Sequence, residues 1–85
     1  MTVDEARIAI LNVLKGLELI NEEKMGSVTK SRDDIEFSAL NIDSVSVVDL
    51  CVGLEERIGR EVTIEELVEN PTVNQLADHF ARAAA

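Results

Sequence analysis

The sequence predicts a small all-α fold: a four-helix bundle of three longer helices and one short helix, with a long first loop. Apolar residues recur at helical spacing in three separate stretches. Threonine or aspartate, residues typical of helix N-caps, stands just before these stretches. Only Phe37 and Phe80 are aromatic, so the core must be built from Val, Ile, Leu and Ala, which suits small helices. A length of 85 residues allows one core, and we expect a single domain over residues 1–85.

The first helix is predicted over residues 3–20. Thr2 and Glu5 have the spacing of a capping box, in which each side chain binds the backbone N–H of the other residue. No strand-like alternation competes with the helical apolar stripe that follows. The stripe consists of Ala6, Ile10, Val13, Leu14, Leu17 and Ile20.

A long loop is predicted over residues 21–41, where the helical periodicity fails. A connection of about twenty residues is uncommon in so small a domain, so it needs anchors. We expect its isolated apolar residues to pin it to the core, through a short helical turn. These residues are Met25, Val28, Ile35, Phe37 and Leu40.

Three further helices are predicted after this loop. The first covers residues 44–58 and stops at Gly59, a residue that suits a helix C-terminus. A second capping box, Thr63 with Glu66, opens a short helix over 63–68. The last helix begins at Asn70-Pro71-Thr72, with proline in a first-turn position. The apolar positions are Val47, Val48, Leu50, Cys51, Leu54 and Ile58 in the first of these helices and Val73, Leu76, Ala77 and Phe80 in the last.

The chain is strongly acidic, with a formal net charge of −9. This charge disfavours binding to nucleic-acid phosphates and to anionic membranes. Residues 43–69 alone carry eight acids and two bases. Such a concentration predicts a docking surface for basic partners, although acidic helices also occur simply because they are soluble.

Cysteine and histidine, two residue types that often react or bind metals, occur once each. The single cysteine, Cys51, excludes an intramolecular disulfide, and its place in an apolar stripe predicts a buried small hydrophobe rather than a reactive thiol. His79 has no cysteine or histidine partner nearby in sequence, so we expect a surface residue rather than a metal ligand. We expect no metal site, no catalytic residue and, without a signal peptide or membrane span, a cytoplasmic protein.

The pair Asp43-Ser44 stands at the start of the predicted helix 44–58. A serine there is expected to expose its hydroxyl beside the partial positive charge of a helix N-terminus, where a phosphate ester is favourable. An aspartate–serine pair before a helix is also, taken alone, a common capping arrangement. The surrounding residues therefore decide between these interpretations.

The string Phe37-Ser38-Ala39-Leu40-Asn41-Ile42-Asp43-Ser44-Val45 resembles the prosthetic-group attachment motif of acyl and peptidyl carrier proteins. The resemblance extends over residues 37–80 and includes Leu54-Glu55-Glu56, Gly59, Val62, Pro71-Thr72-Val73 and Leu76-Ala77. It implies an acyl-carrier-protein-like fold and a protein that is not an enzyme. It further implies that a phosphopantetheinyl transferase attaches 4′-phosphopantetheine from coenzyme A to Ser44, and that the arm carries acyl groups as thioesters.

The resemblance also implies an interface and a pocket. Enzymes with basic patches, which load and process the acyl group, are implied to meet the helix after Ser44, and the carrier is expected to be a monomer. The implied interface residues are Asp43, Val45, Asp49, Val52, Glu55 and Glu56. The implied lining of an acyl pocket within the core consists of Val47, Cys51, Leu54, Ile58, Val62 and Leu67.

Three positions depart from the family pattern: Asn41 replaces a glycine, Val45 a leucine and Ser46 an acid. Asparagine tolerates left-handed backbone, so the turn before the helix is expected to survive. We expect a freestanding, specialised carrier for fatty-acid-like or polyketide-like biosynthesis. Two alternatives remain open: a peptidyl or aminoacyl carrier, and an acidic helical adaptor without a prosthetic group.

Overall fold

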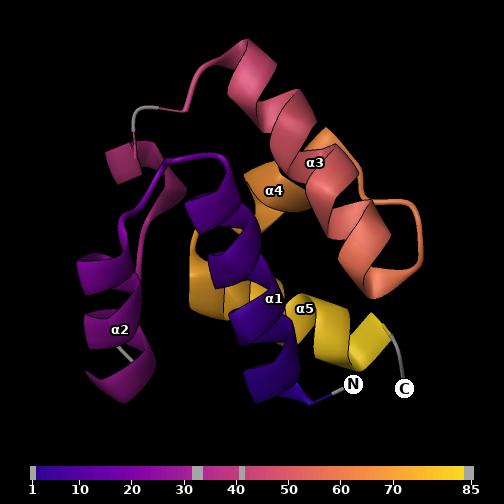
Figure 1. Cartoon of the computed structure of the whole chain (residues 1–85). Helices are drawn as coiled ribbons and strands as arrows, with labels where there is room; N and C mark the ends of the chain where they lie inside the picture. The colour runs from indigo at the N-terminus through magenta and orange to yellow at the C-terminus, as the bar shows by residue number, and fades with distance from the viewer. Residues whose placement is uncertain (1, 32–33, 41, 84–85) are drawn as a thin grey trace.

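A computed structural model describes residues 2–31, 34–40 and 42–83, and it confirms the all-α class (Figure 1). The described residues form five α-helices rather than the four expected, together with one 3-10 turn. The only extended pairing among them is an isolated bridge between Glu36 and Thr72. The elements are α1 (Val3–Gly16), α2 (Glu22–Ser31), η1 (Phe37–Leu40), α3 (Ser44–Ile58), α4 (Ile64–Glu69) and α5 (Val73–Ala83).

Helix α1 is the central element of the bundle. It packs against α5 and α3 and, less extensively, against α2, while the short α4 packs against α3 (Figure 1). The predicted stripe explains this position, because α1 buries residues on neighbouring turns. Its residues with no exposed surface are Ala6, Ile10, Leu11 and Leu14, and they meet fully buried side chains of the other helices, among them Leu50, Leu54, Leu76 and Phe80.

Helix α1 ends at Gly16, four residues earlier than the predicted end at residue 20. The chain leaves the helix through Glu18, which has a left-handed φ of 61°. The backbone N–H of Leu19 donates to the carbonyl of Leu14 at 2.9 Å, and that of Glu18 to Lys15 at 3.0 Å. This pair of bonds is the Schellman termination of a helix. Ile20 is nevertheless buried, so the apolar stripe continues into the turn, and the stripe alone does not reveal where the helix ends.

Helix α2 lies where a loop was predicted, so that prediction was wrong for residues 22–31. Its start has a local signal: the Asn21 side chain accepts a hydrogen bond from the Lys24 N–H at 2.7 Å, and two acids follow in the first turn. It has only two apolar side chains, Val28, which is buried, and Met25, which is half-buried. The helix therefore depends on contacts with α1 that the local pattern does not reveal.

The connection after α2 is pinned to the start of α5. The Phe37 N–H donates to the Pro71 carbonyl and the Val73 N–H to the Ile35 carbonyl, both at 2.9 Å. The side chain of Asp34 accepts the Asn74 N–H at 2.8 Å. Ile35 and Phe37 are buried and η1 forms a helical turn, so the expectation of a pinned connection with such a turn is confirmed.

The remaining helix predictions are confirmed to within a few residues. Helix α3 begins at Ser44 and ends at Ile58, with Gly59 at its C-cap in a left-handed conformation (φ 83°). Helix α4 has the predicted capping box of Thr63 and Glu66. Helix α5 starts directly after Thr72, whose hydroxyl accepts the Gln75 N–H at 3.1 Å. Pro71 therefore precedes the helix, and its predicted place in the first turn was wrong.

Gly53 of α3 lies close to Val13 of α1. A Cβ atom at this position would lie 2.7 Å from Cγ1 of Val13, which is buried and stiff because it is β-branched. We expect Gly53→Ala to destabilise the fold by about 1 kcal/mol, since overpacking costs about 1–3 kcal/mol and better helix propensity returns about 1 kcal/mol. Chemical denaturation measures the change.

Two matched variants test the cause of this effect. Gly26→Ala places the same methyl group in α2, where nothing lies within 4 Å, and is expected to stabilise the protein. Adding Val13→Ala to Gly53→Ala should cost less than the two single changes together, because the smaller side chain relieves the clash. If the changes in the free energy of unfolding of the two single variants simply added up in the double variant, this would contradict the proposed contact.

Candidate functional site

The N-terminus of α3 is built by the pair Asp43-Ser44. Asp43 is the N-cap, with extended backbone (φ −89°, ψ −179°), and Ser44 is the first helical residue. The Asp43 carboxylate accepts the Ser46 N–H at 2.8 Å, and the Asp43 carbonyl accepts the Val47 N–H at 3.0 Å. Ser44 therefore stands at the positive end of the α3 dipole, in the position expected from the sequence, where a phosphate ester is favourable.

The hydrogen bond from the Ser46 N–H lowers the pKa of Asp43 below its ordinary value of 3.8. A lowered pKa in the folded state stabilises the protein at higher pH, and this contribution is lost as the pH falls through the folded pKa. Asparagine keeps a side-chain oxygen for the cap but does not titrate. We therefore expect Asp43→Asn to have a lower Tm than the parent near neutral pH.

The pH dependence of Tm measures this contribution. The difference between parent and Asp43→Asn should shrink as the pH falls from about 6 to about 3, because protonated aspartic acid has no charge to contribute. Glu5, whose pKa is also lowered by its own cap, gives a comparison at another helix start. A difference that stays constant over this range would show that the Asp43 charge has no role.

A row of apolar side chains lies exposed on α3 after Ser44. Val45 is 68% exposed, and Val48 and Val52, three and seven residues further on, are about half exposed. This spacing places them on one face of the helix. Asp49 and Glu56 are exposed as well. Of the predicted interface residues, Asp43, Val45, Asp49, Val52 and Glu56 are therefore accessible on α3 and its cap.

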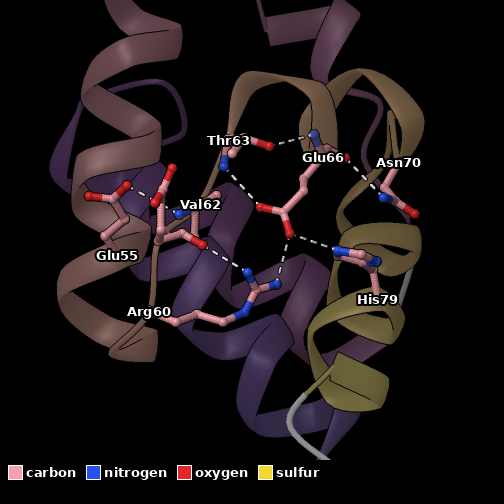
Figure 2. Close-up of polar contacts among 8 residues, drawn as sticks. Glu55, Arg60, Val62, Thr63, Glu66, Asn70 and His79 are labelled. Atoms are coloured by element: carbon pink, nitrogen blue, oxygen red, sulfur yellow. Dashed lines mark hydrogen bonds and ion pairs between the residues drawn. The ribbon is translucent and has the colours of Figure 1, made fainter.

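Glu55 differs from the other residues predicted for this interface. It is half-buried, and its carboxylate accepts the Val62 N–H at 3.1 Å (Figure 2). The bond links α3 to the segment that leads into α4. Glu55 thus helps to hold the end of the α3–α4 connection, an intramolecular role that its place in the acidic run did not suggest.

An apolar cavity of about 210 Å³ opens between η1, α3 and α4. Val47, one turn after Ser44, and Ile42, two residues before it, belong to its lining, so the cavity lies close to the α3 N-terminus. The lining is almost entirely apolar. It consists of Phe37, Ser38, Ile42, Val47, Leu50, Ile64, Leu67, Val68 and Pro71.

Only Val47 and Leu67 of the predicted pocket residues line this cavity. The structure places Cys51, Leu54 and Val62 in the packed core and Ile58 half-buried against it. The cavity therefore lies at the Ser44 end of α3, rather than along its whole inner face. The predicted lining lacked the wall contributed by η1 and, in α4, the neighbours of Leu67, namely Ile64 and Val68. These two are apolar residues in an otherwise acidic short helix, and that pattern is a signal that could have identified them.

Cys51 is buried, as expected from its place in the apolar stripe. Burial raises the pKa of its thiol, and the nearby carboxylates of Glu55 and Glu66 raise it further. A raised pKa disfavours the thiolate, which is the reactive form. The prediction of a buried small hydrophobe is thus confirmed.

His79 was expected to be a surface residue rather than a metal ligand, and the structure places it only partly at the surface. It is half-buried, and its Nε2 lies 3.0 Å from Oε1 of Glu66 (Figure 2). The same oxygen accepts a hydrogen bond from Nη2 of Arg60 at 2.9 Å. Burial raises the pKa of Glu66, but hydrogen bonds from His79, the Thr63 backbone and Arg60 outweigh it, so that the pKa lies below its ordinary value. The network joins residues 6 and 13 positions apart, a separation that local patterns do not reveal.

Some further observations bear on the function. Among residues 2–31, 34–40 and 42–83, no group of three or more His, Cys, Asp or Glu side chains is arranged to hold a metal ion. In the same ranges, no helix has the length and hydropathy needed to cross a membrane. Asn41 replaces a family glycine and was expected to preserve the turn before the helix, but this residue lies outside the described residues.

Comparison with known proteins shows the relationships of this chain. Residues 17–80 match the family described as "Phosphopantetheine attachment site". The chain is 32% identical over 69 residues to the non-reducing polyketide synthase hmp3 of Hypomyces subiculosus, a match that covers 80% of the chain and 3% of that protein. It is 40% identical over 44 residues to nonribosomal peptide synthetase 2 of Gibberella zeae, covering 52% of the chain and 1% of that protein. The chain thus spans a very small part of both relatives. No solved structure matches it.

Proposed function

Because this chain belongs to the family of phosphopantetheine attachment domains, we propose that Ser44 bears the arm and that the domain carries acyl intermediates in polyketide-like assembly. The 4′-phosphopantetheine of this family is bound covalently and supplies a terminal thiol on which acyl groups are held as thioesters. The observation that supports Ser44 is its position as the first residue of α3, beside an apolar cavity.

The residues around Ser44 suit a phosphodiester. The helix N-terminus carries a partial positive charge that favours an anion attached at its first residue. Asp43 caps the helix through the Ser46 N–H, which holds the first turn of α3 in place. Ser44 needs no activating base in this chain, because a separate transferase supplies the chemistry of attachment. We propose that the domain has no catalytic residue of its own.

The cavity supports an acyl cargo. Its volume of about 210 Å³ lies below the roughly 300–1,000 Å³ that is common for pockets holding drug-sized ligands. A cavity of this size suits the first carbons of an acyl chain rather than a whole long chain. Its lining has a single polar side chain, Ser38, so it suits an apolar chain better than a charged group.

The exposed face of α3 supports docking of partner enzymes. We propose that Val45, Val48 and Val52 contact apolar patches of these enzymes, while Asp49 and Glu56 meet basic side chains around them. Charge complementarity of this kind raises the rate of encounter, and apolar contact at the centre supplies affinity. The proposed partners are a phosphopantetheinyl transferase and the enzymes that load and process the acyl group.

Intact-protein mass tests the proposed function directly. The protein is incubated with coenzyme A, magnesium and a broad-specificity phosphopantetheinyl transferase. We expect a mass gain of one phosphopantetheine per chain. A folded protein that gains no mass would contradict the proposal and favour an acidic helical adaptor without a prosthetic group.

A peptidyl carrier is the second candidate, and the match to a nonribosomal peptide synthetase supports it. The two candidates differ in what loads the arm. The arm-bearing protein is offered to an acyl transferase with malonyl-coenzyme A and, separately, to amino-acid-activating enzymes with ATP. Acyl loading without aminoacyl loading is the result expected of the first candidate, and the reverse result would support the second.

A further inference from the structure

A polar network joins α4 to the segment before it and to α5 (Figure 2). We call Arg60, Glu66 and His79 the Glu66 clamp. One oxygen of the Glu66 carboxylate accepts a hydrogen bond from Nη2 of Arg60 at 2.9 Å and lies 3.0 Å from Nε2 of His79. The other oxygen accepts the Thr63 N–H at 2.9 Å. The Glu66 side chain is only 18% exposed, so these bonds form in a partly desolvated environment. Hydrogen bonds are electrostatically stronger there than at the surface.

Helix α4 has few other anchors. It has six residues, too few for a helix to persist in water without tertiary support. Leu67 is its only buried side chain, whereas Val68 is 72% exposed and Ile64 about half exposed. The clamp therefore supplies a large share of what holds α4 in its place.

The same helix forms one wall of the apolar cavity through Ile64, Leu67 and Val68. With about 100° of rotation per residue, these three side chains centre roughly 150° around α4 from Glu66. The clamp thus holds the face of α4 that points away from the cavity. Any shift of α4 against the clamp changes the distance between this wall and the opposite wall, which Val47 and Leu50 form on α3.

We propose that the Glu66 clamp is a positioning device that limits the length of acyl chain the cavity accepts. With the clamp intact, α4 stays close to α3 and the cavity remains small. When the clamp is weakened, α4 moves more freely and the cavity admits a longer apolar chain. The proposal rests on the proposed function, because it assumes that the cavity holds the cargo of the arm.

Glu66→Gln tests the clamp with little damage to α4 itself. Glutamine at this position still completes the capping box with Thr63, because either residue type serves there. It loses the charge that pairs with Arg60 and His79. Glu65→Gln is the matched control, because it removes the same charge from the neighbouring, exposed position of α4. His79→Ala is a second variant, which breaks the clamp from α5 and leaves the capping box intact.

The first measurement is amide hydrogen exchange on the protein without the arm. We expect Glu66→Gln and His79→Ala to raise exchange in α4 at least about tenfold relative to α1, a factor that corresponds to about 1.4 kcal/mol. Glu65→Gln should leave the ratio unchanged. Equal exchange in α4 for all variants would overturn the proposal.

The second measurement is binding of butyryl-pantetheine and decanoyl-pantetheine, followed by the methyl NMR signals of Val47 and Leu67. The clamp variants should shift the affinity ratio towards the decanoyl ligand by several-fold, and the Glu65→Gln control should not. An unchanged ratio, or a shift towards the butyryl ligand, in folded protein would overturn the proposal. Neither measurement requires the arm on Ser44, so failure of the mass assay and failure of the clamp are distinguishable.

Discussion

Ser44→Ala is expected to abolish the gain of phosphopantetheine completely while the fold stays intact. The arm can be attached only through a hydroxyl oxygen, so removing that oxygen removes the bond, not merely some affinity. Alanine is the best helix former, and the side chain of Asp43 supplies the cap of this helix. The expected result is therefore no mass gain in the transferase assay, with an unchanged circular dichroism spectrum and a nearly unchanged Tm.

Two other serines provide matched controls. Ser46 lies two residues later in the same helix, and Ser38 lies in η1 and lines the cavity. Ser46→Ala and Ser38→Ala each remove one hydroxyl near the same site and should still gain one phosphopantetheine. A mass gain that persists in Ser44→Ala, or that disappears in one of the controls, would place the attachment at a different residue.

Arg7→Ala is expected to lower the free energy of unfolding by about 3 kcal/mol. Arg7 is only 5% exposed, so it is a charged residue buried in the fold. Its Nε donates to Oδ1 of Asn74 at 2.8 Å, and its Nη2 donates to the carbonyl of Val28 at 3.0 Å. Alanine leaves both acceptors without this donor and also leaves a space. Small domains have a total stability of about 5–15 kcal/mol, so such a loss is severe.

The loss of stability in Arg7→Ala should not be uniform along the chain. Val28 lies in the last turn of α2, where carbonyls lack a partner inside the helix and where a cation is favoured by the helix dipole. Because α2 has little apolar packing of its own, its amides should lose protection from hydrogen exchange before those of α1 and α3. Denaturant unfolding and residue-resolved exchange measure the two effects.

Arg82→Ala is the control for Arg7→Ala. Arg82 is 80% exposed and pairs with Asp78 one turn earlier, so its removal should change stability by no more than about 0.5 kcal/mol. Equal effects of the two arginine variants would show that the buried hydrogen bonds of Arg7 do not stabilise α2.

The helix starts were predictable because each depends on residues close together in sequence. Thr2 with Glu5, and Thr63 with Glu66, form capping boxes that need only four consecutive residues. Asp43 caps α3 in the same local way, and this cap makes Ser44 the first helical residue, as the local pattern predicts. The resemblance that pointed to the attachment site also depends on consecutive residues, and the family match over residues 17–80 agrees with it.

Local patterns failed where long-range contacts decide the structure. Helix α2 has only two apolar side chains, and a buried arginine from α1 meets its final turn, so its sequence resembles a loop. Arg7 itself offered a signal, because it stands three and four residues before Ile10 and Leu11, inside the apolar stripe of α1. A charged residue at such a position predicts a partner that also comes from within the fold.

The cavity and the Glu66 clamp also depend on contacts between segments that are distant in the sequence. Capping and amphipathic spacing act within one or two turns, and they located α1, α3, α4 and α5 and the position of Ser44. The cavity is assembled from η1, α3 and α4, and the clamp joins residues from three segments of the chain. No short stretch of sequence contains the distance between such segments, because that distance depends on how all the helices pack together.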